Sequence, residues 1–233
     1  MITDINIILQ LIKSKKVLVF DFDGVLADSV EVKTEAFAQI YSEYGEDVIN
    51  NVIDHHRENG GMSRFEKFKF YHKEFLNKVL SEKELIKMAN KFSGLVVKKV
   101  IDSKEIPQAS KFLKQQFNTE KVIAINSATP EEEIKTIVRS RSIDKYFSVV
   151  LGSPSSKEEN LRSILKILKV DKDEAIFFGD ASSDLEASEL VEIDFIGIGS
   201  NLIDKLNGSK KHFHMNDFKK ITKLSEIRMK QKI

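Results

Sequence analysis

Two aspartates, Asp21 and Asp23, directly follow a short apolar segment and could together bind a divalent cation. The segment, residues 17–20, has four consecutive apolar side chains, which predicts a strand buried on both faces of a parallel sheet. Open α/β sheets bind ligands at the carboxyl ends of their strands. A turn starting at Gly24 would let both carboxylates flank one space, and such oxygen ligands suit a hard cation. The alternative is that the two acids only open a solvated loop.

A hydroxyl group follows the second predicted strand, residues 122–125. Ser127 could donate this hydroxyl to a phosphoryl oxygen, and backbone N–H groups at the start of the next helix would add further donors. The alternative is helix capping alone, because Thr129, Pro130 and Glu132 have the composition of a capping box. We expect Thr129 to cap the helix and Ser127 to contact the substrate.

Charged residues follow the third and fourth predicted strands, residues 146–151 and 175–178. Lys157 lies early in a helix, where the positive end of the helix dipole disfavours a cation, so we expect an anion beside it. A solvated surface lysine is the alternative. Asp180 and Asp184 could hold a metal ion or only favour a helix N-terminus. Asp180 follows an apolar strand and a glycine, which favours the metal site.

A long helical segment interrupts the strands. From residue 30 to residue 103 apolar side chains recur at helical spacing and no strand pattern appears. On either side of this segment strands alternate with helices, which specifies a parallel sheet with right-handed crossovers. The sequence therefore predicts an α/β core formed by residues 1–29 and 104–233, with an inserted all-helical domain formed by residues 30–103.

Further elements are predicted from capping signals and periodicity. Two capping boxes mark helix starts inside the insertion, Ser63 with Glu66 and Ser81 with Glu84. Outside it the sequence predicts a helix over residues 4–14, a return linker over 102–108, a helix from Pro107 to Phe117, a short fifth strand over 195–198 and a lysine-rich amphipathic helix after Phe218.

The four polar segments resemble, in order, the four signatures of the haloacid dehalogenase-like (HAD) superfamily of phosphotransferases. The first is Asp21-Phe22-Asp23-Gly24 with the residues that follow it, and the later ones contain Ser127, Lys157 and the pair Asp180 and Asp184. The resemblance covers the whole chain, and the helical insertion stands where the first type of cap stands in the superfamily. It implies a Rossmann-like core with a helical C1-type cap, similar to the phosphoglycolate phosphatase and β-phosphoglucomutase group.

The resemblance implies a Mg²⁺-dependent phosphatase that hydrolyses a small phosphorylated metabolite through an aspartyl-phosphate intermediate. Asp21 would be the nucleophile and Asp23 the general acid and base, a second acid that the dehalogenase branch lacks. Ser127 and Lys157 would complete the catalytic set. The phosphate contacts would come from Gly24, Ser127, Ala128 and Lys157. The metal contacts would come from Asp21, Asp23 through its backbone carbonyl, Asp180 and Asp184.

Substrate choice is expected to lie in the helical insertion. Its segment from His55 to Arg64 contains the pair Gly60-Gly61, which permits an unusual loop conformation. The nearby Arg57, Arg64 and Lys67 could reach a second anionic group of the substrate. We name Arg64 as the substrate contact, with a surface arginine in the first turn of its helix as the alternative.

Composition limits the function classes. Of 233 residues, 41% are hydrophobic and 31% charged, and 37 basic side chains balance 36 acidic ones, so no nucleic-acid or membrane partner is expected. There is no cysteine and therefore no thiolate chemistry. The N-terminus lacks a secretory signal, which predicts a cytoplasmic protein, and we expect a monomer or a homodimer.

Two other functions remain open from the sequence. A phosphomutase of the β-phosphoglucomutase type shares all four signatures and the cap, and would retain the phosphoryl group on a sugar. A non-catalytic phosphate-binding protein could keep the fold, although every catalytic position is intact here. A p-nitrophenyl phosphate assay with and without magnesium would separate the last alternative from the enzymes.

Overall fold

A six-stranded parallel sheet forms the centre of the protein. The computed structural model describes residues 1–119, 121–206 and 212–230. The strand order is β3-β2-β1-β4-β5-β6, and every pairing is parallel, so the predicted α/β class is confirmed. The strands are β1 Val17–Phe20, β2 Val122–Pro130, β3 Val149–Ser153, β4 Ala175–Gly179, β5 Asp194–Ile198 and β6 Phe213–Met215.

Strand β1 lies in the middle of the sheet and is buried on both faces, as its unbroken apolar sequence predicts. Val17 and Val19 pack on one face against helices α8 and α9, while Leu18 and Phe20 pack on the other against α1, α6 and α11. The ring of Phe20 stacks on that of Phe178 in β4, with centroids 4.5 Å apart. The residue after Phe20 therefore emerges at the centre of the carboxyl edge.

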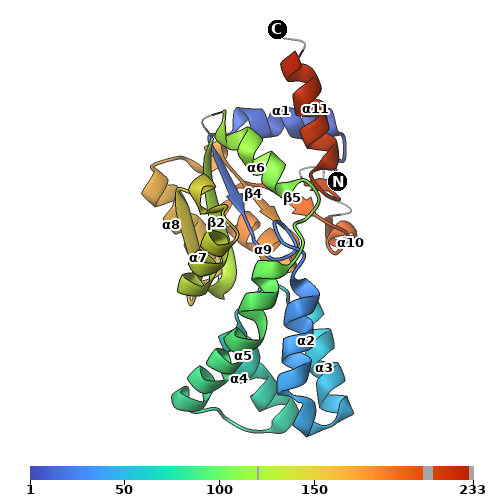
Figure 1. The fold of residues 1–233 in the computed structure, drawn as a ribbon, viewed down its shortest axis with the longest axis vertical. Coiled ribbons are helices and arrows are strands. Elements are labelled where there is room, and N and C mark those ends of the chain that lie inside the picture. The colour runs from blue at the N-terminus through green and yellow to red at the C-terminus, as the bar shows by residue number, and fades with distance from the viewer. Residues whose placement is uncertain (120, 207–211, 231–233) are drawn as a thin grey trace.

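Helices cover both faces of the sheet (Figure 1). The helices of the core are α1 Ile5–Ser14, α6 Ala109–Phe117, α7 Glu131–Ser140, α8 Lys157–Leu168, α9 Ser182–Val191, α10 Ile203–Leu206 and α11 Lys219–Lys230. There are also three short 3₁₀ helices in the described residues, Ser42–Tyr44, Asp144–Tyr146 and Lys172–Glu174. No helix in the described ranges is both long enough and apolar enough to cross a bilayer.

Four helices form a bundle beyond the carboxyl edge of the sheet, at the lower end of Figure 1. They are α2 Val30–Ile40, α3 Glu46–Glu58, α4 Arg64–Leu76 and α5 Glu82–Asp102. Their interior is aromatic: Phe37 contacts the rings of Phe68, Tyr71 and Phe92. Both predicted capping boxes are present at the starts of α4 and α5. We call residues 30–103, which contain these four helices, the helical insertion.

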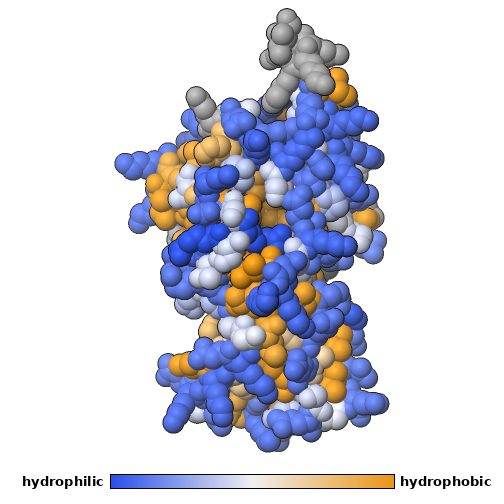
Figure 2. Space-filling model, in the orientation of Figure 1, coloured by the Kyte–Doolittle hydropathy of each residue, from blue (hydrophilic) through white to orange (hydrophobic). Residues whose placement is uncertain are grey.

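The helical insertion meets the sheet domain at a narrower waist. Figure 2 shows mostly hydrophilic residues over the visible face, with hydrophobic residues gathered at this waist. On the core side the guanidinium of Arg141 donates to the backbone oxygens of Val100, Ile101 and Ser103, at 2.8 to 2.9 Å. Arg141 thus anchors the end of α5, where the chain returns to the core.

Several predicted boundaries differ from the structure. Strand β2 continues to Pro130, five residues beyond the expected end, and β3 begins at Val149 because a 3₁₀ turn occupies Asp144–Tyr146. Helix α6 begins at Ala109, after the residues expected to open it. Strand β6 was missed, because three residues are too short for a periodic pattern to show.

A buried ion pair joins the helical insertion to the core. Arg64 in α4 pairs with Glu133 in α7 through two contacts, Nη2 to Oε1 at 2.5 Å and Nη1 to Oε2 at 2.9 Å. Ser93 in α5 donates to the same carboxylate at 2.6 Å, and the guanidinium lies 4.6 Å from the centroid of the Phe92 ring. Arg64 is therefore held between the two parts rather than placed on the surface.

Glu133→Ala is expected to lower the free energy of unfolding by about 3 kcal/mol, because it leaves the Arg64 guanidinium buried without its carboxylate. Urea denaturation would measure the loss. The matched control is Glu132→Ala, since the neighbouring Glu132 side chain is 86% exposed and should change stability by less than about 0.5 kcal/mol. Equal effects of the two substitutions would contradict the role given to this ion pair.

Candidate active site

Asp21 occupies the end of the central strand. Its backbone N–H continues the sheet ladder to the Phe178 oxygen at 2.9 Å, and its side chain is buried. The carboxylate atom Oδ1 accepts a hydrogen bond from the N–H of Phe22 at 2.6 Å. Asp21 lines the main cavity at the carboxyl edge, where β1 separates β2 from β4. This is the place that a parallel sheet provides for a ligand.

Lys157 approaches Asp21 from the first residue of α8. Ser156 caps this helix with Glu159 as the reciprocal partner, so the cap fixes the direction of the Lys157 backbone. The ammonium lies 2.8 Å from Asp21 Oδ1 and 2.8 Å from Asp184 Oδ1, and it donates to the backbone oxygen of Asn126. Burial acts to lower the pKa of Lys157, but the two carboxylates raise it above the usual value. These are the anions that offset its unfavourable position at a helix start.

Three buried carboxylates converge beside this lysine. Asp21, Asp180 and Asp184 each offer an oxygen within 4.8 Å of the others. The turn at Gly24 packs directly on one of them: its φ is +77°, and a Cβ there would lie 2.1 Å from Asp180 Oδ2. Oxygen donors at this spacing, on a site too crowded for a side chain, fit a small hard cation such as Mg²⁺.

The electrostatics of this cluster favour a bound cation. Burial, with the charges of Asp184 and Asp23 adding to it, raises the pKa of Asp21 to about 7 against the pull of Lys157. Burial and the Asp21 charge raise the pKa of Asp180 well above its usual value. A carboxyl group with the pKa of Asp21 is only partly ionised at neutral pH, which corrects the expectation of a fully ionised nucleophile. A divalent cation would supply the charge that keeps these carboxylates deprotonated.

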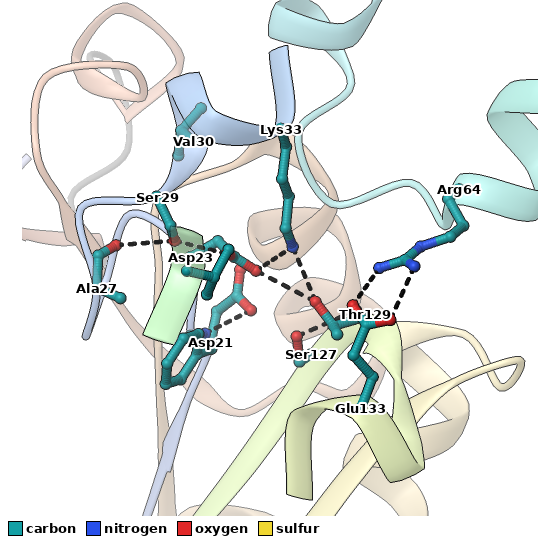
Figure 3. Close-up of polar contacts among 12 residues, drawn as sticks. Asp21, Asp23, Ala27, Ser29, Val30, Lys33, Arg64, Ser127, Thr129 and Glu133 are labelled. Carbon is teal, nitrogen blue, oxygen red and sulfur yellow. Dashed lines mark hydrogen bonds and ion pairs between the residues drawn. The ribbon is translucent and has the colours of Figure 1, made fainter. Parts of the chain in front are cut away.

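Asp23 points to a different set of partners, shown in Figure 3. Its carboxylate accepts a hydrogen bond from Ser29 at 2.6 Å and forms an ion pair with Lys33, the lysine that descends from α2. Burial acts to raise the pKa of Asp23, but Lys33 and Ser29 hold it below its usual value. The Asp23 side chain is not part of the three-carboxylate cluster, so only its backbone could contribute to a metal site there.

Thr129 has a different role from the one expected. Helix α7 begins at Glu131 after Pro130, and no side chain caps it, so the predicted capping by Thr129 is wrong. The Thr129 hydroxyl instead accepts from Lys33 at 2.8 Å and lies 3.4 Å from an Asp23 oxygen. The strand geometry of β2 extends through Thr129, which turns its side chain into the site.

Ser127 is buried at the same edge of the sheet, and its Oγ accepts a hydrogen bond from the Thr129 N–H at 3.1 Å. Its hydroxyl proton remains available for another acceptor. Ala128 follows it and lines the cavity in front of the carboxylates. Of the two predicted phosphate contacts in this segment, Ala128 therefore lines the cavity with Asp21, while Ser127 is buried next to it and is not on the lining.

The cavity between core and insertion has a volume of about 670 Å³. The core contributes Asp21, Asp23, Ala128, Asp180, Ala181, Ser182, Asn201 and Leu202, and the insertion contributes Val30, Lys33, His56, Arg57, Glu58, Asn59 and Gly60. Arg64, the predicted substrate contact, is not on this lining. Lys33 was missed by the sequence analysis, although its position one helical turn after Ser29 could have placed it near the Asp23 loop.

The Gly60-Gly61 pair contacts the core loop that follows β4. A Cβ on Gly61 would lie 1.9 Å from Ser183 Oγ and 3.1 Å from its Cβ, and one on Gly60 would lie 3.2 Å from the Cβ of Ala181. Neither glycine has a positive φ, so the conformational freedom expected for them is not what the loop uses. The pair instead lets the insertion approach the loop between Asp180 and Asp184.

The fold and the site together define an α/β protein. Three buried carboxylates that could hold a cation lie at the carboxyl edge of its sheet, next to a helical insertion. A family model described as haloacid dehalogenase-like hydrolase matches residues 18–198. The chain therefore belongs to the haloacid dehalogenase-like hydrolases, a family of enzymes. Proteins with curated descriptions gave no match.

Solved structures of similar fold cover almost the whole chain. A β-phosphoglucomutase from Clostridium difficile is 20% identical, with a TM-score of 0.73, over 94% of this chain and 96% of that one. A protein titled a predicted phosphoglycolate phosphatase, from Haemophilus somnus 129pt, is 20% identical, with a TM-score of 0.69, over 91% and 98%. A haloacid dehalogenase-like hydrolase from Streptococcus pneumoniae is 18% identical, with a TM-score of 0.67, over 92% and 99%. At these identities the likeness shows the shared fold.

Proposed function

We propose that this chain is a Mg²⁺-dependent phosphatase that hydrolyses a small phosphorylated metabolite through an aspartyl-phosphate intermediate. The observation that carries the proposal is the position of Lys157, whose ammonium touches both Asp21 and Asp184 at 2.8 Å. A carboxylate nucleophile can approach a phosphate dianion only where positive charge cancels their repulsion. Lys157 supplies part of that charge at the nucleophile itself.

Asp21, Asp180 and Asp184 would hold the metal ion, with the backbone carbonyl of Asp23 as a further ligand. When bound, Mg²⁺ would neutralise charge on the phosphoryl oxygens and keep Asp21 ionised. Ser127 and the backbone near Ala128 donate to the remaining phosphoryl oxygens. Asp21 then attacks phosphorus in line, and the P–O bond to the leaving group breaks.

Asp23 acts on the leaving group. It gives its proton to the departing alkoxide, and later takes a proton from the water that hydrolyses the aspartyl phosphate, which restores Asp21. In the structure Asp23 is paired with Lys33 and therefore deprotonated. The protonated form needed for the first step requires that this lysine turn to another anion or that Asp23 gain a proton with the substrate.

Residues 30–103 act as a cap in this proposal. The Gly60-Gly61 contact with the loop after β4 closes one side of the cavity, which excludes water while the ester bond breaks. The buried Arg64–Glu133 pair fixes the cap on the other side. The sequence predicts that Arg64 contacts the substrate. In this proposal Arg64 instead positions the cap.

Gly61→Ala is expected to lower kcat/KM for p-nitrophenyl phosphate about tenfold, because the added methyl group meets Ser183 and displaces the cap loop. The phosphate-release assay would measure it. Gly94→Ala is the matched control: Gly94 lies inside α5 with no atom within 4 Å of the new Cβ, so activity should be unchanged. Full activity of Gly61→Ala would show that this close approach is not needed for turnover.

The proposed activity is tested by release of inorganic phosphate from p-nitrophenyl phosphate and from a panel of phosphorylated sugars and acids, with Mg²⁺ or with EDTA. Reduction with borohydride during turnover would convert an aspartyl phosphate at Asp21 to homoserine, visible in peptide mass spectra. No magnesium-dependent release from any ester would overturn the proposal. A sugar phosphate that is isomerised without phosphate release would replace it by the phosphomutase alternative.

A further inference from the structure

Lys67 is a buried cation without a carboxylate partner in the described part of the chain. It lies in the second turn of α4 and is 1% exposed. Its ammonium is 2.6 Å from Nδ1 of His56 and 5.6 Å from the centroid of the Phe37 ring. No carboxylate of the described residues lies within ion-pairing distance of it. Neither the catalytic steps nor the cap contacts described above use this lysine.

Lys67 lines a side pocket of the main cavity. The side pocket has a volume of about 20 Å³, enough for one oxygen atom, and its lining contains three cations, Lys33, Arg64 and Lys67. It shares Lys33, His56, Gly60 and Ala128 with the lining of the main cavity. Figure 3 shows Lys33 pointing from the insertion toward Thr129, which also lines the side pocket, and Arg64 pointing toward Glu133.

Two of the three cations are already neutralised. Lys33 pairs with Asp23, and Arg64 pairs with Glu133 through both of its terminal nitrogens. Of the three, Lys67 is the one with no carboxylate partner among the described residues, and its ammonium contacts the His56 ring. Burial, with the charge of Lys33 adding to it, lowers the pKa of Lys67 well below its usual value. A buried ammonium without an anion is costly, and an anionic ligand would remove that cost.

His56 connects Lys67 to the main cavity. Burial and the neighbouring Lys67 and Lys33 lower the pKa of His56, so its ring is neutral. A charged Lys67 donates to Nδ1, which places the ring proton on Nε2. An anion in the side pocket would therefore meet donors from lysine ammonium groups in a desolvated space, where such hydrogen bonds are strong.

We propose, on the basis of the phosphatase function above, that Lys67 binds a second anionic group of the substrate, with Lys33 and His56 beside it. The substrate is then a small phosphate ester that carries a carboxylate or a second phosphate a few atoms from the scissile phosphoryl group. One oxygen of that group occupies the side pocket. Arg57 is not part of this subsite, because its side chain is exposed and pairs with Glu31 at 3.2 Å.

Matched substrates test this proposal. 3-Phosphoglycerate and glycerol 3-phosphate differ at one carbon, which bears a carboxylate in the first and a hydroxymethyl group in the second, and glycerol 1,3-bisphosphate supplies the second phosphate. We expect wild-type kcat/KM to favour at least one of the two acidic esters over glycerol 3-phosphate by about 10- to 100-fold, the range of a hydrogen bond to a charged group. The better acidic ester identifies the group that the pocket takes.

Lys67→Met should remove this preference while changing kcat/KM for glycerol 3-phosphate less than about threefold. Lys67→Gln keeps a donor for His56 without the charge, and provides the same comparison if the methionine variant does not fold. Lys69→Met is the control, because Lys69 is exposed on the same helix. Calorimetric titration of Asp21→Asn with the better acidic ester, with and without Lys67→Gln, should show the same loss in affinity.

Equal turnover of acidic and neutral esters by the wild-type protein would overturn the proposal. So would a loss in Lys67→Gln that is the same for all three esters, since that would indicate a structural role. Either result leaves the phosphatase function standing, because phosphate is still released with magnesium. Absence of release from every ester would instead reject the phosphatase function.

Discussion

Asp21→Asn is expected to lower phosphate release by a factor on the order of 10³ or more, because an amide oxygen cannot form the phosphoenzyme. The change keeps the size of the side chain and its contact with the N–H of Phe22. It also removes one negative charge from a buried cluster whose carboxylates raise one another's pKa. The metal-free variant should therefore fold at least as stably as the wild-type protein.

Asp28→Asn is the matched control for this experiment. Asp28 lies in the same loop and its side chain is exposed, so the substitution should leave the rate within about twofold of wild type. Circular dichroism and thermal melting would show that both variants fold. Turnover by Asp21→Asn close to the wild-type rate, after checking for deamidation by mass spectrometry, would reject Asp21 as the nucleophile.

The strand ends were predictable from the sequence because the same physical feature marks each of them. Unbroken apolar runs place β1 and β4 inside the sheet, and the first polar residue after each run must emerge at the carboxyl edge. Asp21 and Asp180 meet there for that reason. Lys157 could be associated with them because a lysine at a helix start needs a nearby anion.

The partners of Asp23 could not be predicted in the same way. Lys33 and Thr129 are 96 residues apart, and they meet only because the fold brings the start of α2 beside the end of β2. The short pattern of Thr129, Pro130 and Glu132 matched a capping box, but the strand extends through Thr129 and leaves Pro130 at the helix start. Helical spacing after Ser29 can place Lys33 near the Asp23 loop, but no local pattern brings Thr129 to the same side chains, because that contact depends on the tertiary fold.

Arg64 is a second residue whose partner could not be predicted from the local sequence. Its position at the start of a helix, beside a glycine pair, suggested an exposed group that reaches for substrate. The chain instead buries it against Glu133, a residue of the core that no local pattern connects with α4. The sequence pattern groups the neighbouring Lys67 with Arg64, and only the structure distinguishes them: Lys67 is buried beside His56 without a carboxylate among the described residues.

Removal of the divalent cation is expected to abolish turnover and to make stability depend on the charge of Asp21. The folded-state pKa of Asp21 is about 7, above its usual value of 3.8. A carboxyl group with a raised pKa binds more protons in the folded than in the unfolded state, so its contribution is present below pH 3.8 and lost as pH rises through 7. In EDTA this group alone should lose about 2 kcal/mol of stability between pH 5.5 and pH 8.

The comparison with Asp21→Asn isolates this effect. Buried histidines with lowered pKa, such as His56, act in the opposite direction below pH 6.5, but they are present in both proteins and cancel in the difference. Urea denaturation in EDTA should show the wild-type protein losing about 2 kcal/mol relative to Asp21→Asn from pH 5.5 to pH 8. A difference that is constant over this range would contradict the raised pKa.

In the proposed site Mg²⁺ should reverse the loss at the higher pH, because it would bind the ionised carboxylates that only the folded state brings together. At 100 times its dissociation constant, the ion would stabilise the wild-type protein at pH 8 by about 2.7 kcal/mol. At pH 5.5 protons compete for the same oxygens, so the stabilisation should be smaller. Asp180→Asn removes one ligand, and should abolish both the magnesium-dependent stabilisation and turnover. If magnesium stabilised this variant as much as the wild-type protein, the ion would be bound elsewhere and the three-carboxylate site would be wrong.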